Sequence, residues 1–355
     1  MKIALISPPL LLTPPRNYGG LEQIVADLGE ALVLQGDEVT LFAPPGSHIS
    51  GGKLIETVIA PERTDVDWVG LEMSAFNMYK DKLQEFDILH DHTWFGGIYL
   101  TKFNPANRNL KIVHTHHGHL SWDVNKVPNQ LKPINLVGIS QFMQKEYESQ
   151  GWDARYVYNG INMNKYPYSE KKGDRLVFVG RISSFKQPHL AIKAAIDTTT
   201  PIDVIGGSFV DNREFLEKIK TMCDDSKGLA TLHLDLPHDK KVEFVQNAKA
   251  CLVPSKMGEP FGLTLIESLA CGTPVIALDD GAIHEVVGRT GEGGAGYVCA
   301  RDGDDLFIKM VGLVGKSGYV IKPEDCRKRA ELFSRENMAK NYKILYEQII
   351  KGEEW

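Results

Sequence analysis

The chain has 355 residues, of which 43% are hydrophobic and 24% are charged, and its net charge is −6. This length and composition are typical of a soluble globular protein with two domains, and the acidic balance argues against nucleic acid as a partner. The sequence contains no apolar run of about 18 residues, and Pro8 and Pro9 interrupt its apolar N-terminus. We therefore expect no membrane span, no signal peptide and a cytoplasmic location, while peripheral membrane association is not signalled and stays open.

The first half of the chain predicts a βαβ opening followed by further short strands. Residues 2–7 are apolar, a proline-rich loop ends at Gly19-Gly20, and apolar residues at helical spacing from Leu21 stop at Gly36 before a strand over 37–43. Glycines at a helix N-terminus let backbone amides approach a phosphate, so Gly19 and Gly20 are candidates for contact with an anion. Short apolar segments predict four more strands, at residues 88–90, 111–115, 136–139 and 156–158.

Six histidines are concentrated in this half: His90, His92, His114, His116, His117 and His119. Such a cluster suggests zinc ligands, but no H-E-x-x-H pattern is present. We also expect histidines two positions apart, such as His90 and His92, to point in opposite directions and not to share an ion. The five cysteines are odd in number and form no C-x-x-C pair, which indicates buried thiols. The prediction is that the chain holds no metal.

A polar, glycine-containing linker over residues 168–174 precedes a second α/β pattern. A strand at 176–180 is followed by Arg181 and Lys186, and Pro188 is a favoured first residue for the next helix. An Arg can bind phosphate oxygens with two hydrogen bonds and a Lys adds a point charge, so together they could neutralise a diphosphate without a metal. The alternative is that both are solvated surface cations. Strands at 202–205 and 230–234 and helices at 213–223 and 239–248 follow.

The stretch from Cys251 to Val287 predicts a strand, a loop, a helix and a second strand, over residues 251–253, 254–260, 261–270 and 275–278. Glu259 lies in the loop beside the positive end of the helix dipole, where unpaired backbone N–H groups are also expected. Glu267 lies inside the apolar helix and is costly to bury unless it is hydrogen-bonded, for which a ligand hydroxyl is a candidate. The alternative is a helix-capping Glu259 and an outward-facing Glu267.

Two remaining patterns are interpreted as structural. Gly291–Gly296 satisfies G-x-G-x-x-G, but a short strand at 297–299 follows it where a dinucleotide site needs a helix. Asp65-Val66-Asp67 has the form D-x-D of a metal motif, but it lies in a polar segment that we interpret as a loop. The C-terminal residues from Phe333 to Ile349 have apolar positions at helical spacing, which predicts a final helix.

The sequence E-P-F-G-L from Glu259, the seven residues between Glu259 and Glu267, and A-C-G-T-P-V from Ala270 together resemble the donor-binding motif of the retaining glycosyltransferases of family 4. Gly180, Arg181 and Lys186 resemble that family's Gly-Arg and Lys pattern, and T-x-H-G is present with His117 as its histidine. The chain departs from the family where Gly-Gly and then Pro-Glu are common, because it has Gly281-Ala282 and His284-Glu285. Gln187 stands where Gly is common, and Asn162 stands where Asp is common.

The resemblance implies a role for each matching residue. Glu259 is expected to hold hydroxyls of the donor sugar, Glu267 to hold the ribose hydroxyls, and Arg181 and Lys186 to bind the donor diphosphate. The side chain or main-chain carbonyl of His117 is expected beside the anomeric carbon. The remaining implied contacts are made by backbone amides. Those of Phe261, Gly262, Leu263 and Thr264 are expected to contact the sugar and phosphate. Those of Gly19 and Gly20, in the first domain, are expected to approach the diphosphate or the acceptor.

The resemblance also implies an α/β fold of the GT-B type, with two Rossmann-like domains that face each other across a cleft. The expected domains are residues 1–169 together with a C-terminal helix at about 336–355 that crosses back, and residues 170–335, which bind the nucleotide sugar. The implied activity is retaining, metal-independent transfer of a hexose-type sugar from a UDP-, GDP- or ADP-sugar to a hydroxyl of a glycan, lipid or small metabolite, without a cofactor. The alternatives are a sugar-nucleotide epimerase or a phosphorylase on the same fold, and a non-catalytic nucleotide-sugar-binding protein.

Overall fold

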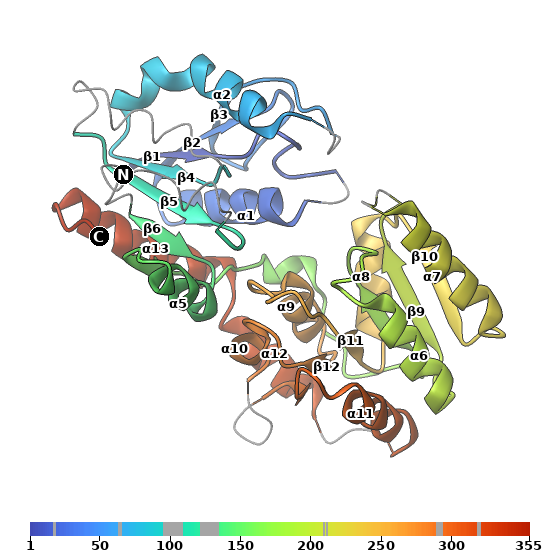
Figure 1. Cartoon of the computed structure of the whole chain (residues 1–355). Helices are drawn as coiled ribbons and strands as arrows, with labels where there is room; N and C mark the ends of the chain where they lie inside the picture. Colours follow the sequence, from blue (N-terminus) through green and yellow to red (C-terminus); the bar gives the residue numbers. More distant parts are fainter. Residues whose placement is uncertain are drawn as a thin grey trace. The chain divides into compact units, whose positions relative to one another are not determined.

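The computed structural model describes residues 1–16, 19–62, 66–94, 109–120, 135–208, 210, 212–288, 294–317 and 321–355. The chain divides into two compact units (Figure 1). Unit 1 comprises Met1–Ile161 and Arg335–Trp355, and unit 2 comprises Asn162–Ser334. Asp65 and residues 291–293, which belong to the two patterns interpreted as structural, lie outside the described residues. None of the described helices is long and apolar enough to cross a membrane.

Unit 1 is built on a parallel sheet of seven strands in the order β3-β2-β1-β4-β5-β6-β7. The central strands are buried almost throughout, which explains their continuous apolar sequence. The strands are β1 (Lys2–Ile6), β2 (Glu38–Ala43), β3 (Lys53–Glu56), β4 (Ile88–Asp91), β5 (Ile112–His116), β6 (Leu136–Gly138) and β7 (Ala154–Tyr156).

The helices of unit 1 include the C-terminal one. They are α1 (Gly20–Leu34), α2 (Trp68–Tyr79), the 3-10 helix η1 (Lys80–Glu85), α5 (Gln141–Ser149) and α13 (Arg335–Ile350). Asp67 caps α2, because its side chain accepts a hydrogen bond from Gly70 N at 3.0 Å. Helix α13 is the last helix of the chain and nevertheless packs on α1, and Arg335 N donates to Ile161 O at 2.9 Å. The expected return of the C-terminal helix to the N-terminal domain is therefore confirmed.

Unit 2 has a parallel sheet of six strands in the order β10-β9-β8-β11-β12-β13. Its strands are β8 (Leu176–Val179), β9 (Ile202–Gly206), β10 (Ala230–Leu234), β11 (Cys251–Val253), β12 (Val275–Leu278) and β13 (Gly296–Cys299). Its helices are the 3-10 helix η4 (Met163–Lys165), α6 (Pro188–Thr198), α7 (Arg213–Asp225), α8 (His238–Asn247), α9 (Leu263–Ala270), α10 (Ile283–Val287), α11 (Asp304–Ser317) and α12 (Pro323–Glu331).

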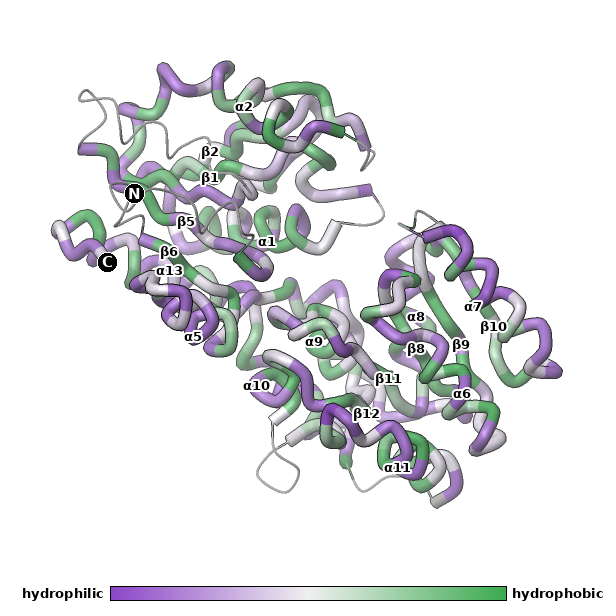
Figure 2. Tube along the Cα trace, viewed as in Figure 1, coloured by the Kyte–Doolittle hydropathy of each residue, from purple (hydrophilic) through white to green (hydrophobic). Residues whose placement is uncertain are grey.

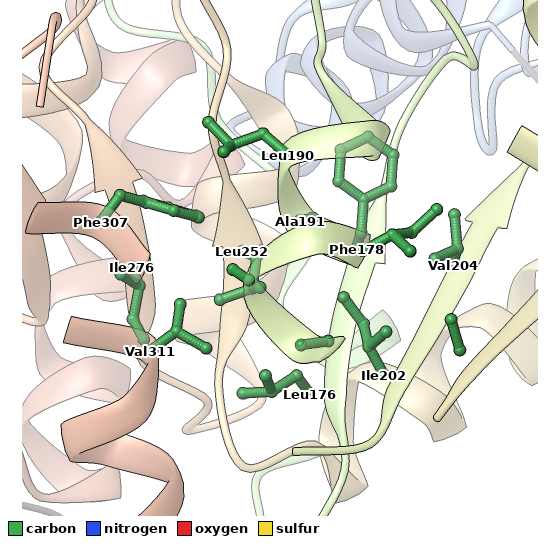
Figure 3. Close-up of a cluster of buried hydrophobic side chains, with 14 of the residues drawn as sticks. Leu176, Phe178, Leu190, Ala191, Ile202, Val204, Leu252, Ile276, Phe307 and Val311 are labelled. Carbon is green, nitrogen blue, oxygen red and sulfur yellow. The ribbon is translucent and has the colours of Figure 1, made fainter. Parts of the chain in front are cut away.

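The core of unit 2 lies between its sheet and the helices that cover it. Figure 3 shows Phe178 and Val204 from adjacent strands near Leu190 and Ala191 of α6, with Phe307 of α11 at another edge of the same cluster. In Figure 2 the tube of α7 changes between hydrophilic and hydrophobic residues, as expected for a helix that covers a sheet with one face. Burial of this cluster holds strands β8 and β11 in fixed positions, and the loops that follow those two strands carry the candidate site.

Candidate active site

The strand order of each sheet reverses at one position. In unit 2 the chain proceeds from β8 to β9 and β10 on one side and returns to β11 and β12 on the other, so the reversal lies between β8 and β11. In open α/β sheets, ligands bind outside the carboxyl ends of the strands at such a switch point. The loop after β8 carries Arg181 and Lys186, and the loop after β11 carries Glu259. Two segments separated by about seventy residues of chain are thus expected at one edge of the sheet, as the parallel arrangement of the strands requires.

Glu259 and Lys186 form an ion pair at this edge. Glu259 is buried, with a relative exposure of 6%, and its Oε2 also accepts a hydrogen bond from Ser255 Oγ at 3.2 Å. The Lys186 side chain is 27% exposed, so the cation reaches the surface while its partner does not. A buried carboxylate is stable only when its charge and its lone pairs are matched. The sequence indicated both residues separately, but it did not indicate that they pair.

The two loops are also joined by a backbone hydrogen bond, because Lys256 N donates to Phe185 O at 2.9 Å. Phe185 is exposed, and so is Arg181, the first residue of its loop. Lys256 Nζ pairs with Asp304 at the start of α11 at 2.8 Å. These contacts hold the loop after β8 against the loop after β11, so that Arg181 and Lys186 extend from a supported segment.

Helix α9 begins at Leu263, two residues later than the sequence predicted. Gly262 precedes it with a φ of 88°, and a Cβ there would lie 2.7 Å from Leu265 Cδ1, so only glycine fits this entry into the helix. No side chain caps the helix, and its first N–H groups, including those of Leu263 and Thr264, lack intrahelical partners. Phe261 is buried against Phe333 at a ring-centroid distance of 5.7 Å. The helix start therefore offers N–H groups and a positive dipole end to an anion.

Glu267 lies one turn further along α9 and does not face solvent, because its side chain is only 13% exposed. Oε1 accepts a hydrogen bond from Tyr166 Oη at 3.0 Å, and Oε2 lies 3.2 Å from Lys241 Nζ. Burial alone would raise the pKa of Glu267, but Lys241, Tyr166 and His238 outweigh it and lower the pKa below its ordinary value. Glu267 is therefore ionised at neutral pH, and its two protein partners were not indicated by the sequence.

The glycine loop of unit 1 leads directly into α1. Gly20 is the first residue of the helix, and Gly19 precedes it with a φ of 150°. A Cβ on Gly19 would lie 2.7 Å from Pro15 Cβ and 2.9 Å from Glu22 Oε2, so a side chain does not fit. Glu22 itself is buried, and burial raises its pKa to about 7. A carboxyl group with a pKa of about 7 therefore lies beside the predicted anion loop, and no sequence motif indicated it.

His117 is half-buried and hydrogen-bonds to a second histidine: its Nε2 lies 2.8 Å from His92 Nδ1. Burial, with smaller contributions from His116 and His114, lowers the pKa of His117 to about 3. The imidazole is therefore neutral at neutral pH. One of its ring nitrogens is already used by His92, so Nδ1 and the main-chain carbonyl are the groups available for a ligand.

The expectation that alternate histidines point in opposite directions was wrong. Residues two apart on a strand share a face, and the rings of His90 and His92 lie 3.9 Å apart between centroids. His90 hydrogen-bonds to Tyr346 Oη at 2.6 Å and to Thr115 Oγ1 at 2.7 Å. In the part of the chain that the structure describes, no group of three or more His, Cys, Asp and Glu side chains is arranged to hold a metal ion.

The turn where the sequence departs from the family packs against Glu259. Ala282 is buried, and its N donates to Glu259 O at 2.8 Å. His284, which stands where Pro is common in the family, lies beside an exposed carboxylate: its Nδ1 is 3.4 Å from Asp279 Oδ1. Gly281 has a φ of 62°, and a Cβ there would lie 2.3 Å from Glu259 O. The turn is thus a direct support of the Glu259 loop.

Solved structures similar to this chain include glycosyltransferases of the GT-B fold. The sucrose-phosphate synthase of Thermosynechococcus elongatus has a TM-score of 0.79 at 20% identity and covers 99% of both chains. AviGT4, a glycosyltransferase involved in avilamycin A biosynthesis, has a TM-score of 0.74 at 22% identity and covers 100% of this chain and 99% of its own. Anabaena HepE, solved with UDP-glucose, has a TM-score of 0.75 at 16% identity over 98% of this chain and 100% of its own. The chain has the GT-B fold.

Sequence comparison defines the family. The model of the glycosyl transferases group 1 matches residues 164–333, and that of Glycosyltransferase Family 4 matches residues 18–165. The chain belongs to glycosyltransferase family 4. Its relatives include a D-inositol 3-phosphate glycosyltransferase of Acidothermus cellulolyticus, 24% identical over 82% of this chain and 77% of the relative. A phosphatidyl-myo-inositol mannosyltransferase of Mycolicibacterium smegmatis is 22% identical over 92% of this chain and 89% of the relative.

Proposed function

We propose that this glycosyltransferase is a retaining, metal-independent enzyme that transfers a hexose-type sugar from a nucleotide-diphosphate sugar to an acceptor hydroxyl. The observation that carries the proposal is the Lys186–Glu259 ion pair at the switch point of unit 2, beside the uncapped start of α9. The names of the similar proteins agree with it: one is a mannosyltransferase, and one structure contains UDP-glucose. Inositol derivatives in the relatives' names favour a polyhydroxylated acceptor.

The donor would be held by groups with distinct tasks. Glu267, fixed by Tyr166 and Lys241, would accept hydrogen bonds from the ribose hydroxyls. Arg181 and Lys186 would bind the diphosphate, since a guanidinium and an ammonium together can balance its charge without a metal ion. Glu259 would accept hydrogen bonds from hydroxyls of the sugar.

Backbone amides would complete the donor contacts. In unit 2 they come from Phe261 to Thr264 at the start of α9, and Gly19 and Gly20 offer the equivalent groups in unit 1. A neutral His117 would contact the sugar near its anomeric carbon. These contacts would fix the sugar and the diphosphate before reaction, which removes orientational freedom from the chemical step.

The transfer step would proceed on one face of the sugar. The bond from the anomeric carbon to the phosphate oxygen breaks as the acceptor oxygen bonds to that carbon from the same side, so the anomeric configuration is retained. The leaving phosphate oxygen takes the acceptor proton, and no further base is required. The cations Arg181 and Lys186 and the dipole of α9 stabilise the negative charge that develops on the leaving group, which is electrostatic preorganisation.

The first test is the shift in melting temperature with UDP, GDP and ADP, each with and without EDTA. A nucleotide that binds only the folded state stabilises it by mass action, by about 2.7 kcal/mol at a hundredfold excess over Kd. We expect stabilisation by one nucleotide that survives EDTA. Absence of a shift with all three would contradict the donor site, and a shift abolished by EDTA would contradict its metal independence.

The second test is the substitution Glu259→Ala in a transfer assay with the donor that this nucleotide indicates. Loss of the sugar contact should reduce kcat/KM at least tenfold, which corresponds to about 1.4 kcal/mol of transition-state stabilisation. Glu243→Ala is the matched control, because Glu243 is exposed on α8 and pairs only with Lys240 among the contacts described. Turnover of the Glu259→Ala variant near that of the wild type would refute the assigned role. Release of an isomerised sugar nucleotide without acceptor, or a requirement for phosphate, would instead favour an epimerase or a phosphorylase.

A further inference from the structure

Asp280 occupies a turn whose backbone N–H groups converge on its carboxylate. Oδ2 accepts hydrogen bonds from Met257 N and Gly258 N, both at 2.7 Å, and from Glu259 N at 3.2 Å. Successive N–H groups that point to one place form an anion-binding concavity, and the φ of 70° at Gly258 is what permits it here. The side chain of Asp280 is only 2% exposed. The chain therefore fills this anion site with a carboxylate of its own.

The contact fixes the backbone of Glu259 from two directions. Asp280 Oδ2 holds its N–H, and Ala282 N donates to its carbonyl oxygen at 2.8 Å. Gly281, between those two partners, lies so close that a Cβ would be 2.4 Å from Glu259 N. The peptide groups on both sides of the Glu259 Cα are held, so the position of its Cα–Cβ bond is fixed by these backbone contacts. Lys186 and Ser255 then need only orient the carboxylate at the end of the side chain.

The other oxygen of Asp280 is also engaged. Oδ1 lies 3.0 Å from Arg301 Nε, and the side chain of Arg301 is 57% exposed. The pair compensates the charge of Asp280 from the solvent side while leaving Oδ2 to the three N–H groups. Charge-assisted hydrogen bonds to a carboxylate are stronger than those to a neutral acceptor. A neutral side chain at position 280 would thus hold the Glu259 loop less firmly, even with the same shape.

We infer that Asp280 is a positioning residue for sugar recognition. By holding the backbone of Glu259, it places the Glu259 carboxylate where it can accept hydrogen bonds from the donor-sugar hydroxyls. The inference rests on the proposed function, in which Glu259 contacts that sugar. Asp280 itself does not touch the donor, because Oδ2 is saturated by backbone groups. It also keeps the converging N–H groups of residues 257–259 from binding phosphate, which leaves the start of α9 as the anion site of this edge.

The test compares Asp280→Asn with Asp279→Asn. The control makes the same chemical change one residue away, at an exposed carboxylate whose described side-chain partner is His284. Binding is measured for three pairs of probes: UDP and UDP-glucose, GDP and GDP-mannose, and ADP and ADP-glucose. In the Asp280→Asn variant we expect the sugar nucleotide to bind at least tenfold more weakly and the matching nucleoside diphosphate to bind within twofold of wild type. The control should leave both affinities within twofold.

Two further readouts separate positioning from general stability. Hydrogen exchange of the peptide that contains Met257, Gly258 and Glu259 should be at least tenfold faster in Asp280→Asn, with other peptides unchanged. The double variant Asp280→Asn, Glu259→Ala should bind the sugar nucleotide no more weakly than Glu259→Ala alone, because Asp280 acts through Glu259. Additive losses in the double variant would refute the inference.

The binding results also show whether the role of Asp280 or the proposed function itself has failed. A wild-type protein that binds none of the sugar nucleotides more tightly than its nucleotide would refute the proposed sugar contact, and with it the inference. A wild type that discriminates and an Asp280→Asn variant that discriminates equally well would refute the inference alone. If Asp280→Asn does not fold, Arg301→Gln replaces it, since it removes only the exposed partner of Asp280. The same pattern is then expected at a threefold or greater loss, and no loss would contradict the inference.

Discussion

Glu22 lies in the first turn of α1 and is buried, with a relative exposure of 6%. Burial raises its pKa from 4.5 to about 7, against the opposing hydrogen bond from its own backbone N–H. The folded state therefore holds the carboxyl proton more tightly than the unfolded state does. The stabilisation of the folded state by this bound proton is fully present below pH 4.5 and is lost as the pH rises through 7. At 1.36 kcal/mol for each pKa unit, the loss amounts to about 3 kcal/mol.

The substitution Glu22→Gln removes this titration while keeping the shape of the side chain. The free energy of unfolding of the variant, relative to wild type, should increase by about 3 kcal/mol between pH 4.5 and pH 8.5. Urea unfolding followed by tryptophan fluorescence measures it for unit 1 specifically, because unit 2 contains no tryptophan. The five tryptophans that report are Trp68, Trp94, Trp122, Trp152 and Trp355.

Glu38→Gln is the matched control for this experiment, since Glu38 is an exposed glutamate of the same unit at the start of β2. Its stability difference from wild type should stay within about 0.5 kcal/mol at both pH values, as is usual for surface substitutions. If the difference for Glu22→Gln is the same at pH 4.5 and pH 8.5, the carboxyl group does not hold its proton in the folded state, and the reasoning from burial is refuted.

Two other predictions follow from the buried titratable groups. His117, whose pKa burial lowers to about 3, should show no change in its imidazole NMR signals between pH 5 and pH 8. A titration near pH 6.5 would mean that the ring is solvated, and it would contradict the lowering of its pKa by burial. Glu267 has a lowered pKa, so its pairing with Lys241 and Tyr166 stabilises the fold above pH 4.5, and this stabilisation disappears as the pH falls through the folded-state pKa. Glu267→Gln should accordingly lower the melting temperature more at pH 7 than at pH 4, and an equal loss at the two pH values would contradict the lowered pKa.

The sequence predicted the strands of unit 2 most closely. Strands β10, β11 and β12 begin and end where they were predicted, because buried parallel strands are short apolar runs bounded by polar or Gly- and Pro-containing turns. Edge elements were predicted less well. Strand β3 was missed because its pattern is half exposed, and β7 was predicted two residues too late, since its middle residue Arg155 is exposed. Helices α2 and α5 were missed as well. The GT-B fold itself was expected from the motif resemblance and is confirmed.

For the candidate site, the sequence identified single residues but not their partners. Glu259 and Lys186 were predicted from separate motifs, and their ion pair depends on two loops brought together by the strand order. His92 was set aside with the other histidines, although it is the direct partner of His117. Asp280 carried no signal, because the turn it supports lies more than twenty residues earlier in the chain. The Lys186–Glu259 pair depends on the reversal of strand order between β8 and β11. The contacts of Asp280 and of His92 instead join the segments that follow two adjacent strands, β11 and β12 or β4 and β5. Local sequence patterns encode neither kind of contact.

The histidine pairing limits what unit 1 can contribute to the proposed transfer. A His117 with a pKa of about 3 carries no positive charge at neutral pH, and its Nε2 is occupied by His92, so it can offer only a neutral contact to the sugar. The charge of a departing diphosphate must then be balanced elsewhere. In the proposed function, Arg181, Lys186 and the start of α9 would supply the balancing positive charge from unit 2, and Gly19 and Gly20 of unit 1 would add only backbone amides. If the two units have these separate roles, replacing His117 should disturb the orientation of the sugar. Replacing Lys186 should disturb both the binding of the diphosphate and the Glu259 carboxylate with which Lys186 pairs. The second effect is expected because a buried carboxylate that loses its cationic partner is strongly destabilised.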